Sequence, residues 1–271
     1  MGHYGVSKWE ANCKMATLIW LFLLIAVTVI WGHVTANSLV HKRINIKAKD
    51  WPEESTRILF LSDLHTSGRG YRIQRTIKLA KKVPCDIVCI TGDIIVRRVK
   101  QEEKVVKVIK EIANGRPTYL VWGNNDYNKE IDRSKLYTEL EEANINILVN
   151  ERVKYRELVI GGLGDPFWQK DDIEKTLTEN VDLLLSHTPG PIVNVNRRAK
   201  LMLAGHTHAG QFCWIDGSPL IPELRNKKAF AYGLSYFNGT YIYTTSGIGT
   251  TRLPLRYFCH PELVLLEVKP Q

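Results

Sequence analysis

The stretch ILFLSDLH (58–65) begins as an apolar run and ends in a serine, a carboxylate and an imidazole. Four consecutive apolar residues suit a strand that is buried on both faces of a sheet. The same arrangement, an apolar run followed at once by Asp, Asn or His, recurs at DIVCITGD (86–93), TYLVWGNND (118–126), DLLLSH (182–187) and KLMLAGHTH (200–208). Ligands bind beyond the carboxyl ends of strands in open α/β sheets, so we expect these five segments to build one site.

Segments with helical spacing separate the early strands, at 71–82, 102–113 and 134–143. Alternation of strands and helices predicts an α/β fold with parallel strands covered by helices. Further apolar runs predict strands at 145–149, 157–163 and 263–268. The pair Asn238-Gly239, between alternating residues, predicts a β-hairpin.

Each of these polar strand ends is weak evidence by itself, because a lone Asp after a strand is usually a turn residue. Their order is more specific. Asp63-x-His65, Gly92-Asp93, Gly123-Asn124, an isolated His187 and Gly205-His206-x-His208 follow one another along the chain. This combination resembles the calcineurin-like metallophosphoesterase superfamily, and the C-terminal part is similar to its membrane-associated bacterial branch. UDP-diacylglucosamine pyrophosphatases are among the phosphoesterases that it resembles.

The resemblance implies a four-layer α-β-β-α sandwich and two divalent metal ions, with Mn²⁺, Fe²⁺ or Zn²⁺ as the candidates. The implied ligands form two groups that share one carboxylate: Asp63, His65 and His208 for the first ion, Asn124, His187 and His206 for the second, and Asp93 between them. Oxygen and imidazole nitrogen donors without cysteine suit such hard or borderline ions. Asp93, Asn125 and His187 are the expected catalytic residues.

The implied reaction is hydrolysis, in which a hydroxide that bridges two metal ions attacks phosphorus. In many members of the superfamily the residue directly after the ligand asparagine is a histidine, whereas this chain has Asn125 at that position. An asparagine cannot deliver a proton to a poor leaving group at neutral pH. We therefore expect a phosphodiester or pyrophosphate substrate, with a lipid-linked pyrophosphate such as UDP-2,3-diacylglucosamine as the guess by analogy. The alternatives are a catalytically weak metal- or phosphate-binding membrane protein, or a nuclease.

The N-terminal region has no Asp, Glu, Lys or Arg from Met15 through His41. About 20 apolar residues cross a bilayer core, so we predict a transmembrane helix at about 15–34 within an anchor of residues 1–40. A linker at 41–55 and a phosphoesterase domain at 56–271 would follow. A cleaved signal peptide is the rival interpretation, since Val34-Thr35-Ala36 resembles a cleavage site. The flanking basic residues favour a cytoplasmic catalytic domain.

The composition, 44% hydrophobic and 24% charged over 271 residues, is that of an ordinary globular protein. Five cysteines without a CxxC pair favour a reducing compartment. The net charge of +9 would attract anionic lipid, phosphorylated substrates or nucleic acid, although no arginine-rich tract favours nucleic acid and no protein partner is implied. Four further polar residues are secondary candidates that stay outside the predicted site: Asp165, Arg252, Arg256 and His260. Gly164-Asp165-Pro166 resembles a turn, and Arg252 and Arg256 lie in a C-terminal loop where they would meet either a phosphate or solvent.

Overall fold

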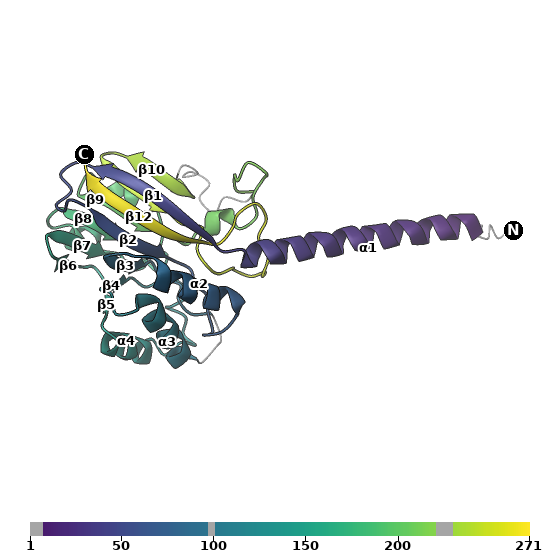
Figure 1. Cartoon of the computed structure of the whole chain (residues 1–271), viewed down its shortest axis with the longest axis horizontal. Helices are drawn as coiled ribbons and strands as arrows, with labels where there is room; N and C mark the ends of the chain where they lie inside the picture. The colour runs from purple at the N-terminus through teal and green to yellow at the C-terminus, as the bar shows by residue number, and fades with distance from the viewer. Residues whose placement is uncertain (1–7, 97–100, 221–229) are drawn as a thin grey trace.

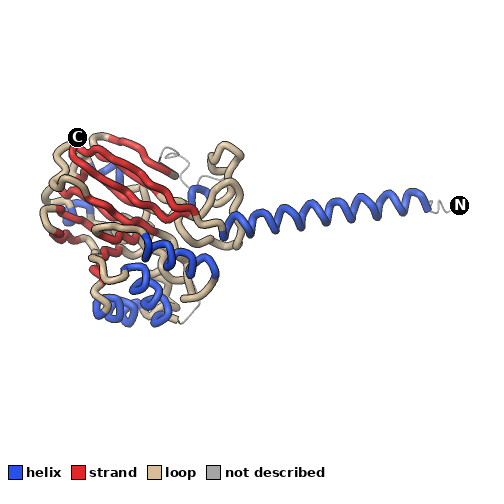
Figure 2. Tube along the Cα trace, in the orientation of Figure 1, coloured by secondary structure: helices blue, strands red, loops and turns tan. Residues whose placement is uncertain are grey.

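The computed structural model describes residues 8–96, 101–220 and 230–271 (Figure 1). Within these ranges a long N-terminal helix leads into two six-stranded sheets with covering helices. The helices are α1 (Lys8–Asn37), α2 (Tyr71–Lys82), α3 (Glu102–Ala113), α4 (Arg133–Glu142), α5 (Ile173–Thr176) and α6 (Ile192–Val195), with a 3₁₀ turn η1 (His208–Gly210). Figure 2 shows that α1 projects from a body that contains all the strands of the described residues.

The first sheet has its strands in the spatial order β1 (Val40–Ala48), β12 (Glu262–Pro270), β2 (Thr56–Leu61), β3 (Ile87–Ile90), β4 (Thr118–Leu120) and β5 (Ile145–Ile147). Strands β2 to β5 are parallel, and helices α2, α3 and α4 connect them in turn. The carboxyl ends of β2, β3 and β4 therefore meet at one edge of the sheet.

The second sheet has the order β10 (Gly233–Phe237), β11 (Thr240–Thr244), β9 (Ala199–Ala204), β8 (Val181–Leu185), β7 (Leu158–Gly162) and β6 (Glu151–Tyr155). Strands β7, β8, β9 and β11 are parallel. The hairpin β10–β11 turns at Asn238 and Gly239, whose φ angles are 43° and 86°. Both residues thus have the left-handed backbone that a tight hairpin needs.

Alternating side chains of β2 explain its continuous apolar sequence. Ile58 and Phe60 belong to the core between the two sheets, whereas Leu59 and Leu61 pack with the α2–α4 layer. Period-two alternation places successive side chains on opposite faces, and both faces are covered here. Among the described residues, the helices on the outer face of the second sheet are the four-residue α5 and α6. The expected α-β-β-α layering is therefore present, with a thin fourth layer.

The N-terminal end of the fold differs from the expected linker. Residues 41–48 form most of β1, which pairs in parallel with β12 along nine residues, from Val40 with Glu262 to Ala48 with Pro270. The linker prediction is wrong for this segment: Arg43 and Lys47 lie exposed on an edge strand, whereas Lys42 pairs with the buried carboxylate of Glu262 at 3.0 Å. Among the described residues, α1 is the one helix long and apolar enough to cross a membrane, and very little of it is buried.

Candidate metal centre

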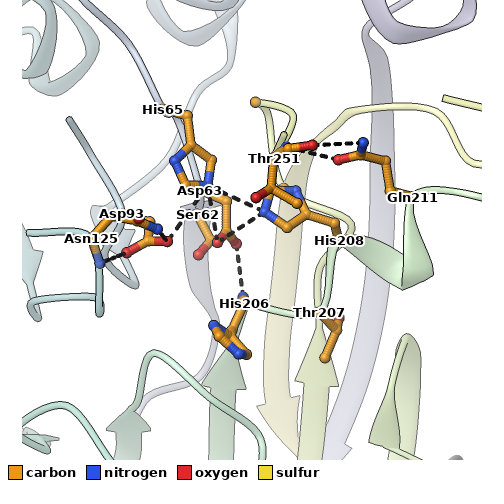
Figure 3. Close-up of polar contacts among 12 residues, drawn as sticks. Ser62, Asp63, His65, Asp93, Asn125, His206, Thr207, His208, Gln211 and Thr251 are labelled. Atoms are coloured by element: carbon orange, nitrogen blue, oxygen red, sulfur yellow. Dashed lines mark hydrogen bonds and ion pairs between the residues drawn. The ribbon is translucent and has the colours of Figure 1, made fainter. Parts of the chain in front are cut away.

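Loops at the carboxyl ends of strands from both sheets bring the seven predicted ligands together. Figure 3 shows five of them, Asp63, His65, Asp93, His206 and His208. Asp63 and His65 follow β2, Asp93 follows β3, and Asn124 follows β4. From the second sheet, His187 follows β8, and His206 and His208 follow β9. Two sets of three residues have donor atoms that all lie within 4.8 Å of one another inside the set. The first set is Asp63, His65 and His208, and the second is Asp63, Asp93 and His187.

The first group consists of Asp63, His65 and His208. The Nε2 atoms of His65 and His208 are 3.2 Å apart, and their rings stack at 5.1 Å. Nε2 of His208 lies 3.6 Å from Oδ1 of Asp63. Three donor atoms from two sheets thus converge on one point.

The second group consists of Asn124, His187 and His206. Oδ1 of Asn124 lies 2.9 Å from Nε2 of His187 and 2.9 Å from Nδ1 of His206. The two ring nitrogens are 3.1 Å apart. A carbonyl-type oxygen and two imidazole nitrogens therefore face one another, which is a suitable donor set for a divalent ion.

Asp93 lies between the two groups. Its Oδ2 is 3.5 Å from Nε2 of His65, and its Oδ1 is 3.5 Å from Nε2 of His187. One carboxylate thus contacts a histidine of each group, which is the geometry of a bridging ligand. A fold without this placement would have contradicted the predicted dinuclear arrangement.

The tautomer of His187 follows from its second nitrogen. Nδ1 lies 2.7 Å from the carbonyl oxygen of Thr91, which can only accept, so Nδ1 donates. In the neutral ring, Nε2 then has a lone pair directed at Asn124 and Asp93. Such a hydrogen bond to a backbone carbonyl fixes the orientation of many metal-binding histidines.

The charges in this cluster also suit a bound cation. Burial, reinforced by His187, lowers the pKa of His206 to about 4, and burial with His65 depresses the pKa of His208 strongly. Burial alone would lower the pKa of His187, but the carboxylates of Asp93 and Asp63 outweigh it and raise that pKa to about 9. The site thus favours neutral imidazoles at His206 and His208, and it favours added positive charge next to Asp93 and Asp63.

One buried atom points most directly to a missing positive partner. Oδ2 of Asp63 accepts a hydrogen bond from the backbone N–H of His206 at 2.9 Å, whereas the buried Oδ1 has no hydrogen-bond partner. An unpaired buried carboxylate oxygen is costly. Because it faces Nε2 of His208, a metal ion shared by these donors would satisfy it. The residues present therefore fit a divalent metal.

The backbone of the site is left-handed at several of the ligands. Positive φ angles occur at Asp63 (52°), His65 (40°), Asp93 (52°), His206 (70°) and His208 (51°). Left-handed backbone is uncommon outside glycine and concentrates at functional sites. His206 and His208 consequently point to different ligand groups, as the two contacts at Nε2 of His65 and Oδ1 of Asn124 show.

Two glycines permit this dense packing. A Cβ atom on Gly123 would overlap the backbone N and the carboxylate of Asp93 and lie 2.8 Å from Cε1 of His187. A Cβ atom on Gly205 would overlap Oγ of Ser62 and lie 2.5 Å from Oδ2 of Asp63. The glycines of the motifs are therefore needed for close approach of the ligand loops.

Asp126, to which we had assigned no role, organises the two central loops. Its fully buried carboxylate accepts four backbone N–H groups, from Asp93 (2.8 Å), Gly123 (2.8 Å), Ile94 (3.0 Å) and Ile95 (3.3 Å). Burial and the nearby Asp93 raise its pKa to about 7. These bonds fix the loop after β3 to the loop after β4. Its place two residues after the ligand Asn124 is the sequence feature that could have indicated this role.

Asn125 also contacts the predicted bridging residue. Its backbone N–H donates to Oδ1 of Asp93 at 2.7 Å, and its side-chain amide donates to Oδ2 of the same carboxylate. Asn125 is 8% exposed and belongs to the cluster. Its contacts orient the carboxylate of Asp93.

The residues left outside the predicted site divide into two kinds. Arg256 is fully buried, and its Nη2 donates to the carbonyls of Gly249 (2.6 Å) and Ser246 (2.7 Å) beside Nδ1 of His208. Asp165 is also buried, and its Oδ2 accepts from the N–H of Trp168. Arg252 and His260 lie at the surface. The sequence analysis thus missed the buried position of Arg256 beside His208, because the sequence around Arg256 gave no sign of burial.

An aromatic pair borders the second group. Nε1 of Trp168 donates to the carbonyl of Asn124 at 2.9 Å, and the ring of Phe167 lies 6.0 Å from that of His206. Both aromatic side chains are about half exposed. They form an apolar margin beside polar donors, and no sequence pattern indicated their place.

Comparison with known proteins supplies the family. The sequence model described as Calcineurin-like phosphoesterase matches residues 56–210. The chain is 28% identical to the uncharacterized metallophosphoesterase YkoQ of Bacillus subtilis (strain 168) over 240 residues, which cover 83% of this chain and 88% of YkoQ. It is 30% identical to the phosphodiesterase YaeI of Escherichia coli (strain K12) over 223 residues, which cover 78% and 82%.

Among solved structures, TT1561 of Thermus thermophilus is similar, with a TM-score of 0.49 and 12% identity over 71% of this chain and 90% of that one. The sequence match to the family spans every strand end that contributes to the cluster, from Asp63 to His208. This chain therefore belongs to the calcineurin-like metallophosphoesterases, metal-binding hydrolases that act on phosphoester bonds.

Proposed function

We propose that this chain is a membrane-tethered phosphohydrolase that uses two divalent metal ions to cleave a phosphodiester or pyrophosphate. The position of Asp93 carries the proposal, because its two oxygens each lie 3.5 Å from a histidine of a different ligand group. A pair of bound ions would supply a nucleophile at neutral pH and stabilise charge on the phosphoryl oxygens. Mn²⁺, Fe²⁺ and Zn²⁺ all suit the donor set.

The protein's own groups prepare the site for that chemistry. The carbonyl of Thr91 orients the ring of His187, and the N–H of His206 orients Asp63. Asp126 holds the loops that carry Asp93 and Asn124 at a fixed separation. Preorganised donors of this kind need little rearrangement when charge develops on the substrate.

Asn125 supports a substrate with a weakly basic leaving group. Its amide cannot transfer a proton at neutral pH, and its two N–H groups donate to Asp93. A leaving group that is already a weak base, such as a nucleotide phosphate, needs little general-acid assistance. This favours a phosphodiester or phosphoanhydride over an alkyl phosphomonoester.

Helix α1 supports a membrane location and hence a lipid-linked substrate. The helix is long and apolar enough to cross a bilayer, and its side chains are almost entirely exposed. A soluble protein would not leave such a surface uncovered. A lipid-linked pyrophosphate such as UDP-2,3-diacylglucosamine combines both features, and the basic residues after α1 favour a catalytic domain on the cytoplasmic side.

The test is hydrolysis by the full chain in detergent micelles loaded with Mn²⁺. Bis(p-nitrophenyl) phosphate, p-nitrophenyl phosphate, UDP-2,3-diacylglucosamine and single-stranded DNA serve as parallel substrates. We expect turnover of the diester and the lipid-linked pyrophosphate, and we expect Asp93→Asn to lower it by more than the about 10- to 100-fold that outer-shell partners of metal ligands contribute.

Asp132→Asn is the matched control, since this exposed helix-capping carboxylate lies outside the cluster. Equal turnover by the wild-type protein and Asp93→Asn would favour a metal- or phosphate-binding protein without catalysis. Preferential cleavage of DNA would favour a nuclease.

A further inference from the structure

The segment between β11 and β12 packs directly against the end of helix α1. The N–H of Arg256 donates to the carbonyl of Gly32 at 3.0 Å, and the hydroxyl of Tyr257 donates to the carbonyl of Thr28 at 2.9 Å. The ring of Trp31 meets that of Phe258 at 4.8 Å. The catalytic domain thus contacts α1 over its last two to three turns.

These contacts fix a depth along the helix. The apolar segment of α1 ends near Val34, and Thr28 is six residues earlier. At 1.5 Å per residue, Thr28 lies about 9 Å below that end. A bilayer has a hydrocarbon core of about 30 Å, which the apolar segment from Met15 to Val34 just spans. The hydroxyl of Tyr257, which donates to the carbonyl of Thr28, therefore reaches about 9 Å past the hydrocarbon boundary near Val34 and into the core of the leaflet.

Exposed apolar side chains surround this contact. The interfacial rim, as we call them, consists of Trp214 (61% exposed), Ile215 (85%), Leu253 (53%) and Phe258 (39%). Figure 1 shows the loops that carry them gathered around the domain end of α1.

Backbone contacts join the two loops of the rim. The N–H of Cys213 donates to the carbonyl of Tyr257 at 3.0 Å, and the side-chain amide of Gln211 donates to the carbonyl of Leu253 at 3.1 Å. The turn that carries Trp214 and Ile215 therefore has a fixed position beside Tyr257. Four large exposed apolar residues on two joined loops are more than the scattered exposure usual on a soluble surface.

We propose that the interfacial rim inserts into the membrane leaflet from which α1 emerges. The inference rests on the proposed membrane-spanning role of α1, and it adds that the catalytic domain itself binds the lipid surface. The exposed guanidinium of Arg252, next to Leu253, would meet lipid phosphates at the same level. Tryptophan and tyrosine at the edge of an apolar patch suit the boundary between acyl chains and headgroups.

The rim also locates the metal centre relative to the membrane. Arg256 lies in the same segment as Leu253 and Phe258, and its guanidinium is 3.3 Å from Nδ1 of His208. His208 precedes the loop of Trp214 and Ile215 by only a few residues. The first ligand group therefore lies directly behind the surface that contacts lipid.

The experiment measures quenching of tryptophan fluorescence in vesicles that contain phosphatidylcholine with brominated acyl chains. The full chain is reconstituted, and the signal of Trp214 is obtained by comparing the wild-type protein with Trp214→Phe. Trp20, within α1, is isolated in the same way with Trp20→Phe and reports on the membrane span. A matched control adds Tyr137→Trp to the Trp214→Phe protein, because Tyr137 is 37% exposed on α4, away from α1 in Figure 1.

We expect Trp214 to be quenched at least half as strongly as Trp20 and the tryptophan at 137 to be quenched little. Strong quenching of Trp20 without quenching of Trp214 would overturn the docking of the rim and leave the anchor intact. Absence of quenching at both positions would overturn the rim and the membrane-spanning role together. Hydrolysis of bis(p-nitrophenyl) phosphate by the same vesicles reports separately on the proposed enzyme activity.

As a second variant, Ile215→Glu should reduce the quenching of Trp214 at least twofold, because a carboxylate at the most exposed position of the rim opposes insertion. Unchanged quenching in Ile215→Glu would contradict insertion of this loop. The side chains of Trp214 and Ile215 are both exposed, so neither Trp214→Phe nor Ile215→Glu removes a core contact.

Discussion

Replacement of the buried carboxylate of Asp126 by an amide should destabilise the catalytic domain and disturb its metal centre. The carboxylate accepts two N–H groups at each oxygen: Asp93 and Gly123 at Oδ2, Ile94 and Ile95 at Oδ1. An asparagine has only one accepting oxygen. Its NH₂ group would face one of the two pairs, and two buried N–H groups would lose their acceptor.

The expected loss follows from those two donors. A buried group without its partner costs about 1–3 kcal/mol, so Asp126→Asn should lower the free energy of unfolding by about 2–6 kcal/mol. The loops after β3 and β4 would also separate, because Asp126 joins them. Metal bound per chain should therefore decrease in Asp126→Asn, since Asp93 and Asn124 would no longer face the same point.

The assay is urea unfolding of the full chain in detergent micelles, together with elemental analysis of bound metal. Asp132→Asn is the matched control: Asp132 caps α4 by accepting the N–H of Lys135 at 3.0 Å, and asparagine caps a helix about as well. If Asp126→Asn unfolds within about 0.5 kcal/mol of that control and retains its metal, the role we assign to Asp126 is refuted.

Three further outcomes are expected. Chelation of divalent metal should lower the melting temperature and added Mn²⁺ should restore it, because only the folded cluster binds the ion; an unchanged melting temperature would contradict the ligand set. Gly205→Ala should reduce bound metal, since its Cβ would overlap Ser62 and crowd Asp63, whereas full metal content would show that the loop can yield. Burial would raise the pKa of Asp86, but Arg57 outweighs it and holds that pKa below the ordinary 3.8; this contribution to stability is present above the unfolded-state value and is lost as the pH falls through the lower folded-state value. The difference in urea midpoint between the wild-type protein and Asp86→Asn should therefore shrink on acidification, and a constant difference would contradict the pairing.

The interior of the fold could be predicted because its strands have covered faces. The apolar runs before Asp63 and Asp93 match β2 and β3 within about two residues, and the predicted helix at 102–113 coincides with α3. Helical and strand periodicities are strongest where one or both faces are buried. The edge strands β1 and β6 were not predicted, since β1 carries several basic residues and β6 reads ERVKY.

The candidate site could be predicted as a set of residues but not as a geometry. The order of polar strand ends identified Asp63 through His208, because ligand types and spacing are properties of sequence. The left-handed backbone at His206 and His208, and the burial of Arg256, depend on contacts among distant loops. Trp168 likewise reaches Asn124 only after the two sheets stack. Such contacts have no local signature.

The missing linker changes how the membrane and the active site are related. A flexible segment of 15 residues would let the domain move about 20 Å from the end of the anchor, in many orientations. Instead, only Ser38 and Leu39 separate α1 from β1, and β1 is hydrogen-bonded to β12 along its whole length. The guanidinium of Arg72 also donates to the carbonyl of Ala36 at 2.9 Å, at the end of the helix. With the contacts of Tyr257 to Thr28, these bonds hold α1 and the domain as one body, so an α1 that spans a bilayer would fix which face of the domain meets the lipid.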